Sequence, residues 1–430
     1  MQAGDYVRVK TRGKEAEGLY MPNSDEKTVF LKLDSGYNLG IHRKNIKNIR
    51  LIKKFKEKNK KIEKAPFDRK LPTISILHTG GTIASKVDYR TGGVVSRFEP
   101  RELLAMFPEL GKICNIKSRL VAQMFSEDMR FKHYELMAKA IEKEIKEGVD
   151  GIILTHGTDT MGYSSAALAF MLGDLPIPVI LVGAQRSSDR GSSDAGVNLI
   201  CAASFIAKTD FSGVAICMHE NMEDKNCVIL PALKTRKLHT SRRDAFKPVN
   251  DTIIAKIDYK SKKIDFIKKN YVKKDKKRRL KTQAKMEERV AILRVHPNLF
   301  PEQIENYKNY KGLVIEGTGL GHAPVGVPNE YCKINEKNLN AFRNLIKKGV
   351  IMVMTSQTIF GRVNMNVYST GRDLQDIGMI PGEDLLTETA FIKLAWLLGN
   401  YKKDQVRELI NKNLRGEIAE RALVKEDFLE

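Results

Sequence analysis

The sequence predicts an α/β protein, in which a large doubly wound α/β domain and a smaller α/β domain follow a small β-barrel. Three observations support this fold class. Short alternating segments with frequent turn residues occupy the N-terminal part, and apolar runs alternate with helical patterns after it. A long basic stretch then divides the α/β part into two blocks. The length of 430 residues leaves room for about three domains.

The first block, residues 1–52, is predicted to be the barrel. Apolar and polar residues alternate at 5–9, 28–33 and 37–41, as expected of strands. Turn-forming residues lie between them, namely Gly13, Gly18, Asn23, Ser35 and Gly36. Several strands of about five residues in so short a block are typical of an SH3-like barrel. A lysine-rich linker is expected at 53–72.

The second block, residues 73–270, is predicted to be the large domain. Continuous apolar runs at 74–77, 151–155 and 179–182 indicate strands buried on both faces, as in a parallel sheet. Helical patterns lie between them, at 131–147 and 164–172. In a doubly wound sheet, ligands bind beyond the carboxyl ends of the strands.

The third block, residues 288–415, repeats this alternation on a smaller scale. Strands of the buried type are expected at 290–295, 313–315 and 350–354. Helices are expected at 335–348 and 385–398. The basic, aperiodic stretch at 256–285 is interpreted as the separator between the two α/β blocks.

The net charge of +22 is concentrated in two segments. Residues 42–70 hold 13 Lys/Arg against 3 Asp/Glu, and residues 256–289 hold 15 against 5. Each segment is therefore either a solvated surface or a footprint for a polyanion such as RNA. No apolar run is long enough for a membrane span, and the N-terminus lacks a signal-peptide pattern. The five scattered cysteines are expected to be reduced thiols in a cytoplasmic protein.

Two threonine- and glycine-rich turns follow predicted strands. They are Thr79–Ala84, with the sequence TGGTIA, and Thr155–Met161, with the sequence THGTDTM. Paired glycines let the backbone approach a ligand and leave amides for an anion, and a threonine hydroxyl there can serve as a nucleophile. Taken alone, such a turn is more often a helix cap or a phosphate loop than the site of a threonine nucleophile.

Together, the two turns resemble the signatures of the bacterial-type L-asparaginase family. Further segments match that family in order, at 125–129, 182–187 and 237–250. The resemblance covers about residues 71–400 and leaves the barrel and linker outside. It implies an asparaginase-like large domain that contains the active site, followed by the smaller domain.

The resemblance also implies catalytic roles for individual residues. Thr82 corresponds to the nucleophile that attacks a side-chain amide and forms an acyl-enzyme. Thr158, Asp159 and Lys237 correspond to a second triad, in which the lysine amine acts as a base if its surroundings lower its pKa. Several cations near Lys237 are alternatives to it or solvated surface charges, namely Lys234, Arg236, Arg242 and Arg243.

Substrate-binding roles follow from the same resemblance. Ser126 is expected to bind the substrate α-carboxylate, and Glu127 and Asp159 its α-ammonium. Tyr89 falls in the lid of the family, and the backbone of Ala184 is a candidate for stabilising the oxyanion. Many free asparaginases have glutamine at the position of Glu127, so the ammonium site departs from the common pattern.

Within this family, the chain resembles the asparaginase-type subunit of archaeal glutamyl-tRNA(Gln) amidotransferases. The added barrel, the basic segments and the form of residues 237–246 favour this branch. The resemblance implies glutamine or asparagine as amide donor, with ammonia passed to a partner, GatE, that acts on Glu-tRNA(Gln) using ATP and Mg²⁺. No cofactor is expected in this chain. A homodimer core within a heterotetramer is expected, without membrane attachment.

Two other functions remain open. One is a free cytosolic L-asparaginase or glutaminase with an incidental barrel. The other is a non-catalytic RNA-binding module, which the presence of all four triad-type residues disfavours. The turn at Gly317–Gly321 has the wrong spacing for a dinucleotide loop, and the eight histidines form no metal-binding pattern. The preference between glutamine and asparagine stays undetermined.

Overall fold

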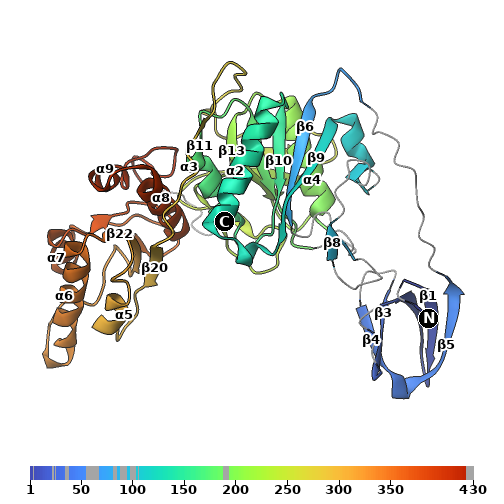
Figure 1. The fold of residues 1–430 in the computed structure, drawn as a ribbon, viewed down its shortest axis with the longest axis horizontal. Coiled ribbons are helices and arrows are strands. Elements are labelled where there is room, and N and C mark those ends of the chain that lie inside the picture. The colour runs from blue at the N-terminus through green and yellow to red at the C-terminus, as the bar shows by residue number, and fades with distance from the viewer. Residues whose placement is uncertain are drawn as a thin grey trace.

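The structure is a computed structural model of the full chain. It describes residues 1–2, 4–21, 24, 26–33, 38–54, 67–80, 85–87, 94–96, 103–104, 106–186 and 193–422. A small five-stranded β domain, a large α/β domain and a smaller α/β domain follow one another along the chain (Figure 1). Across the described ranges, every helix is too short or too polar to cross a membrane.

The N-terminal domain is an antiparallel sheet with the strand order β4-β3-β2-β1-β5. Its strands are β1 (Tyr6–Thr11), β2 (Glu15–Tyr20), β3 (Thr28–Lys32), β4 (Asn38–His42) and β5 (Ile46–Lys53), with the turn η1 (Arg43–Asn45) before β5. The alternation along β1 places Val7 and Val9 in a small apolar core with Leu31. The predicted β domain is confirmed, and β2 and β5 are strands that the sequence pattern did not reveal.

The large domain is built on a sheet with the order β18-β17-β14-β13-β12-β10-β6-β9. In that order the strands are β18 (Ile264–Phe266), β17 (Ala255–Asp258), β14 (Asn226–Pro231), β13 (Gly213–His219), β12 (Pro178–Val182), β10 (Gly151–Thr155), β6 (Thr73–Gly80) and β9 (Asn115–Met124). The five strands from β13 to β9 run parallel. The doubly wound prediction is therefore confirmed.

Helices cover both faces of this sheet (Figure 1). They are α2 (Phe131–Lys146), α3 (Met161–Met171) and α4 (Ala195–Lys208), with the short turns η2 (Pro108–Lys112) and η3 (Ser126–Asp128). Tyr134, Met137, Ala138 and Ile141 form the buried stripe of α2 at helical spacing. In contrast, α3 is buried over most of its circumference and is mainly apolar.

The smaller domain has the parallel sheet β20-β21-β22-β23. Its strands are β20 (Val290–Arg294), β21 (Gly312–Gly317), β22 (Ile351–Ser356) and β23 (Ile380–Pro381). Its helices are α5 (Pro301–Glu305), α6 (Ile334–Lys347), α7 (Ser369–Asp376), α8 (Thr387–Asn400) and α9 (Lys403–Leu409), with the turn η4 (Glu330–Cys332). The strands and helices predicted for this block are confirmed.

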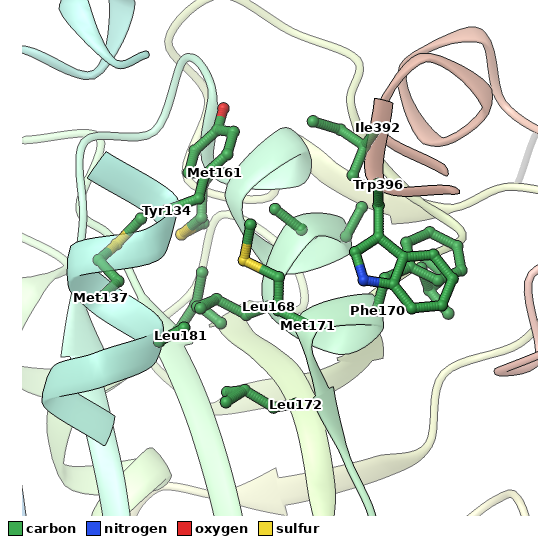
Figure 2. Close-up of a cluster of buried hydrophobic side chains, with 14 of the residues drawn as sticks. Tyr134, Met137, Met161, Leu168, Phe170, Met171, Leu172, Leu181, Ile392 and Trp396 are labelled. Carbon is green, nitrogen blue, oxygen red and sulfur yellow. The ribbon is translucent and has the colours of Figure 1, made fainter. Parts of the chain in front are cut away.

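Helix α8 joins the two α/β domains. Its apolar side chains share one core with α3 of the large domain. Trp396 stacks on Phe170 with ring centroids 5.3 Å apart (Figure 2), and its indole donates to the carbonyl of Gln283 at 2.9 Å. The C-terminal half of α8 is thereby fixed against α3 of the large domain.

The basic stretch at 256–285 is not the aperiodic separator that the sequence suggested. Its first part forms β17 and β18, the edge of the large sheet, because Ile257 and Ile264 alternate there with charged residues. Three further two-stranded pairs lie outside the main sheets: β7 (Ser85–Val87) with β8 (Val94–Ser96), β11 (Leu172–Gly173) with β19 (Lys281–Thr282), and β15 (Thr235–Lys237) with β16 (Phe246–Pro248).

Many cations of this stretch are neutralised within the chain. Within residues 256–289, all of which the structure describes, seven lysines pair with acidic side chains: Lys256, Lys262, Lys263, Lys268, Lys273, Lys276 and Lys281. Six of these lysines pair with acids of the large domain outside the segment, and Lys263 pairs with Asp265 inside it. These pairs weaken the interpretation of the segment as a polyanion footprint.

Candidate active site

The candidate site lies at the carboxyl edge of the large sheet. Strands β9, β6, β10 and β12 are parallel neighbours, so the loops that follow them meet at one edge. Thr155, at the end of β10, is in register with His78 on one side and Val182 on the other. The loops after these strands contain every matched segment except the one around Lys237.

The turn after β10 brings three predicted catalytic residues together. The Lys237 Nζ donates to the Thr158 Oγ1 at 2.9 Å and to the Asp159 Oδ1 at 2.7 Å. The Lys237 side chain is only 13% exposed, whereas that of Asp159 is 65% exposed. The lysine side chain is therefore largely enclosed by the protein, whereas the carboxylate faces solvent, where a ligand can reach it.

The hydrogen-bond and ion-pair partners distinguish Lys237 from the neighbouring cations. Each of the others has a different acidic side chain: Lys234 pairs with Asp384, Arg236 with Glu388, Arg242 with Asp244 and Arg243 with Asp224. Only Lys237 among these five points at the turn with Thr158. The geometry thus favours Lys237 over the alternatives that the sequence left open.

The loop after β9 is fastened to the same turn. The Thr160 hydroxyl donates to the carbonyl of Ser126 at 2.6 Å. Gly157 packs against Ser126 so closely that a Cβ there would lie 2.8 Å from the Ser126 Cβ. These contacts place Ser126 and its neighbour Glu127 beside Thr158 and Asp159.

Ser126 is prepared for a polar ligand. Its side chain is buried, and its Oγ has no hydrogen-bond partner in the described part of the chain. Buried hydroxyls are nearly always paired, so an orphan at the sheet's ligand edge is a position where a ligand oxygen can supply the missing contact. Glu127 is exposed on η3 next to it.

The loop after β12 supports Thr158 from the other side. A Cβ on Gly183 would lie 2.8 Å from the Thr158 Cγ2, so only glycine leaves the threonine in place. Ala184, which follows it, is buried. The close approach explains why a glycine directly follows this buried strand.

An acid and an amide that the sequence analysis did not single out hold this loop. Asp194 accepts from the backbone amides of Gln185 and Arg186 at 3.0 and 2.9 Å. Asn198 donates to the carbonyl of Gly183 at 3.0 Å. Little in the sequence indicated this role, because an aspartate directly before an apolar helix, as Asp194 is, is usually a helix cap.

Two buried histidines form hydrogen bonds that stabilise the turns. His78 contacts the Thr155 hydroxyl at 2.9 Å, and His156 contacts the Ser164 hydroxyl at 2.7 Å. Burial lowers the pKa of His78 to about 3 and the pKa of His156 to about 4, so both are neutral near pH 7. They are positioned as structural supports.

Thr82 and Tyr89 lie outside the described residues. The strand that leads to Thr82 is described as far as Gly80, and Thr79 donates to the carbonyl of Thr155 at 2.9 Å. The first residues of the two threonine- and glycine-rich turns, Thr79 and Thr155, are therefore hydrogen-bonded to each other. In the described ranges, no group of three or more His, Cys, Asp or Glu side chains is arranged to hold a metal ion.

The assembled groups suit chemistry on a small zwitterionic molecule. An ammonium and a hydroxyl lie side by side at Lys237 and Thr158, an outward carboxylate lies at Asp159, and an unpaired buried hydroxyl lies at Ser126. A carboxylate can hold a ligand ammonium, and a hydroxyl can donate to a ligand carboxylate. An amine beside a hydroxyl can transfer a proton.

Comparisons with known proteins match all three domains. The family model described as the GatD N-terminal domain matches residues 1–52. The model of the asparaginase N-terminal domain matches 73–271, and that of the glutaminase/asparaginase C-terminal domain matches 289–410.

Curated relatives resemble the chain over nearly its full length. The D subunit of glutamyl-tRNA(Gln) amidotransferase (GatD) from Pyrococcus furiosus is 44% identical, over 97% of this chain and 95% of the relative. The GatD protein from Methanococcus maripaludis strain S2 is 44% identical, over 98% of this chain and 99% of the relative.

Solved structures of asparaginases share the α/β part of the fold. The L-asparaginase from Thermococcus kodakarensis aligns with a TM-score of 0.70 and 27% identity, and L-asparaginase I from Vibrio cholerae with 0.69 and 26%. Each alignment covers 81% of this chain and 99% of the other. About a fifth of this chain therefore has no counterpart in these two asparaginase structures, whereas the GatD relatives align with nearly all of it.

Proposed function

The chain belongs to the GatD family of glutamyl-tRNA(Gln) amidotransferase subunits, with an amidohydrolase domain of asparaginase type, and we propose that it releases ammonia from glutamine or asparagine for a partner protein. The observation that carries this proposal is the match over nearly the whole chain, including the N-terminal domain. A free asparaginase or glutaminase, the alternative function, explains only the α/β part.

In the proposed reaction, the Thr82 hydroxyl attacks the carbon of the substrate's side-chain amide. The hydroxyl proton passes to a base, and the C–N bond breaks as ammonia leaves with an added proton. The product of this step is an ester between Thr82 and the substrate acyl group. Water then hydrolyses that ester and releases glutamate or aspartate.

Lys237, Thr158 and Asp159 are proposed to manage the protons of these steps. The lysine amine can take a proton through the Thr158 hydroxyl, to which it is hydrogen-bonded at 2.9 Å. Asp159 contacts the same nitrogen at 2.7 Å and compensates its positive charge. Both contacts support the assignment of these residues as the second triad.

The substrate's backbone groups are proposed to bind at the loop after β9. Ser126, buried and unpartnered within the described residues, would donate to the α-carboxylate. Asp159 and Glu127 would hold the α-ammonium, since both carboxylates are exposed at this edge. The same groups serve glutamine and asparagine, which differ by one methylene, worth only about 1–3 kcal/mol of discrimination.

The wider setting of the reaction is also a proposal. Family membership implies an amidotransferase complex. We expect a homodimer of this chain to bind two copies of GatE, which would activate Glu-tRNA(Gln) with ATP and Mg²⁺ and accept the ammonia in the cytoplasm. Docking the two proteins would keep ammonia from protonation in bulk water.

One assay tests this function. Amide hydrolysis is measured with glutamine and with asparagine, first for the purified chain, then with GatE, ATP, Mg²⁺ and Glu-tRNA(Gln). Hydrolysis near background until the partners are added, and lost in Thr82→Ala, is the expected result. Full turnover by the isolated chain, unchanged by those additions, would favour the free asparaginase instead.

A further inference from the structure

The segment that ends at Lys237 is held by the smaller domain of the same chain. Lys237 is the last residue of β15, which pairs only with the equally short β16 in the described part of the chain. Three residues of strand are a weak support for a catalytic side chain. The additional contacts come from the loop before α8 and from the first turn of that helix.

The first of these contacts is a buried ion pair. The Lys234 ammonium, three residues before Lys237, pairs with the Asp384 carboxylate, and the two side chains are 3% and 5% exposed. Asp384 also accepts from the backbone amide of Ala419 at 3.0 Å, which ties the C-terminal tail to the same point. A carboxylate shielded from water attracts a cation strongly, so this ion pair holds the backbone near Lys234 in one position relative to Asp384.

Two further contacts fix the residues on either side of Lys234. The Thr389 hydroxyl donates to the carbonyl of Leu233 at 2.7 Å. The Arg236 Nε lies 3.1 Å from the Glu388 Oε1. Glu388 and Thr389 are neighbours in the first turn of α8, whose other end is anchored by the Trp396 stack on Phe170.

We propose that Asp384 is a positioning residue for Lys237, assisted by Glu388 and Thr389. Together they hold the segment 233–236 at three points against the beginning of α8, so the backbone from which the Lys237 side chain extends to Thr158 and Asp159 stays in place. This inference rests on the proposed function, because it assigns these residues a part in amide hydrolysis. Nothing in it requires them to touch substrate.

The proposal predicts a loss of turnover rather than of binding. Asp384→Asn leaves the buried Lys234 ammonium without a counter-charge, so residues 233–237 shift to give it water. A displacement of about 1 Å at a catalytic group can lower the rate about 100-fold. Ser126 and Glu127 come from a different loop and remain in place, and only Asp159 loses its Lys237 contact, so KM is expected to change much less than kcat.

The test measures kcat and KM for glutamine hydrolysis by the complete complex with Glu-tRNA(Gln). Asp384→Asn is expected to lower kcat about 100-fold, and Asp384→Glu, which keeps the charge, to recover most of it. Glu144→Gln is the matched control, since that buried carboxylate pairs with Arg119 at 2.9 Å on the distant helix α2. Its kcat should stay within twofold of the unmodified complex.

A second readout reports on Lys237 itself. Limited acylation with an amine-reactive reagent, followed by mass spectrometry, gives the reactivity of this lysine relative to exposed lysines. Asp384→Asn should change that ratio severalfold, and Glu144→Gln should leave it unchanged. This measurement needs neither substrate nor partner.

The outcomes separate this inference from the proposed function. An unmodified complex without hydrolysis would refute the function and not the positioning contacts, which the reactivity ratio still tests. A folded Asp384→Asn complex with unchanged kcat and unchanged Lys237 reactivity would overturn the inference. If Asp384→Asn does not fold, Glu388→Gln and Thr389→Val decide, and normal kcat in both would also overturn it.

Discussion

Lys237 donates a hydrogen bond of 2.9 Å to the hydroxyl of Thr158, a residue 79 positions earlier in the chain. The contact fixes the roles of the two groups. At this separation, the neutral amine of Lys237 can take the proton of the Thr158 hydroxyl, and the threonine oxygen can in turn take a proton from substrate or water. The pair is thereby arranged as a proton relay that ends at the lysine.

Replacing Lys237 by methionine should abolish most hydrolysis. The loss of a positioned base lowers rates about 100- to 10,000-fold, whereas the aliphatic stem keeps its packing. Ammonia release by the complete complex measures the effect. Arg242→Met is the control, because its guanidinium is bound to Asp244 at 2.8 Å through two contacts. Equal losses in both variants would contradict the role of Lys237.

Ser126→Ala should raise KM and leave kcat nearly unchanged. A hydrogen bond to a charged group is worth about 1.5–3 kcal/mol, which corresponds to a KM about 10- to 150-fold higher. The unliganded protein should lose no stability, because the hydroxyl has no partner in the described residues. Ser204→Ala on α4 removes another buried, unpartnered hydroxyl, and its KM should match the unmodified complex.

Gly183→Ala should impair turnover through contact with Thr158. The added methyl carbon would lie 2.8 Å from the Thr158 Cγ2, so the threonine must move by several tenths of an ångström. We expect kcat to fall about 10-fold or more, since catalytic geometry tolerates little displacement. Gly13→Ala, where an added carbon meets nothing within 4 Å, should be neutral. Unchanged kcat in Gly183→Ala would show that Thr158 needs no fixed position.

The buried histidines should make the large domain less stable at mildly acidic pH. Their pKa values in the folded protein, about 3 for His78 and about 4 for His156, lie below the usual value of 6.5. The unfolded chain therefore binds more protons between pH 6.5 and pH 4, and stability falls as the pH is lowered through that range. Each histidine should contribute about 2 kcal/mol of loss between pH 7 and pH 5.

Urea unfolding followed by the fluorescence of Trp396 measures this effect. Trp396 is the single tryptophan and lies in the core shared by α3 and α8. His156→Gln should remove about 2 kcal/mol of the loss between pH 7 and pH 5. A transition midpoint that is independent of pH between 7 and 5 would show that the histidines are not buried as neutral groups.

The sequence predicted the parts of the fold that depend on local pattern. Continuous apolar runs identified β6, β10 and β12, and β20, β21 and β22 of the smaller sheet, because burial on both faces leaves a distinct composition. Strand β9 was missed, since at the sheet edge it mixes charged and apolar residues. The three-residue strands β15 and β16 were also missed, because so short a segment carries no period.

The candidate site was predicted only in part. The turn with Thr158 and Asp159 follows directly from a buried strand, so its place at the sheet edge could be inferred. The partner of Lys234, in contrast, lies 150 residues away, and ion pairing between distant segments depends on the tertiary fold. For the same reason, the acids that neutralise the basic stretch could not be recognised in advance.

The distribution of thiols offers a route to observing domain motion. All five cysteines are described and free, and four of them are buried. Burial raises the pKa of Cys114 to about 12, which suppresses its reactive thiolate form. Cys332, in the turn before α6, is the one that a maleimide dye can reach in the folded chain. A single fluorophore can therefore be placed on the smaller domain without engineering, to report when partners assemble around it.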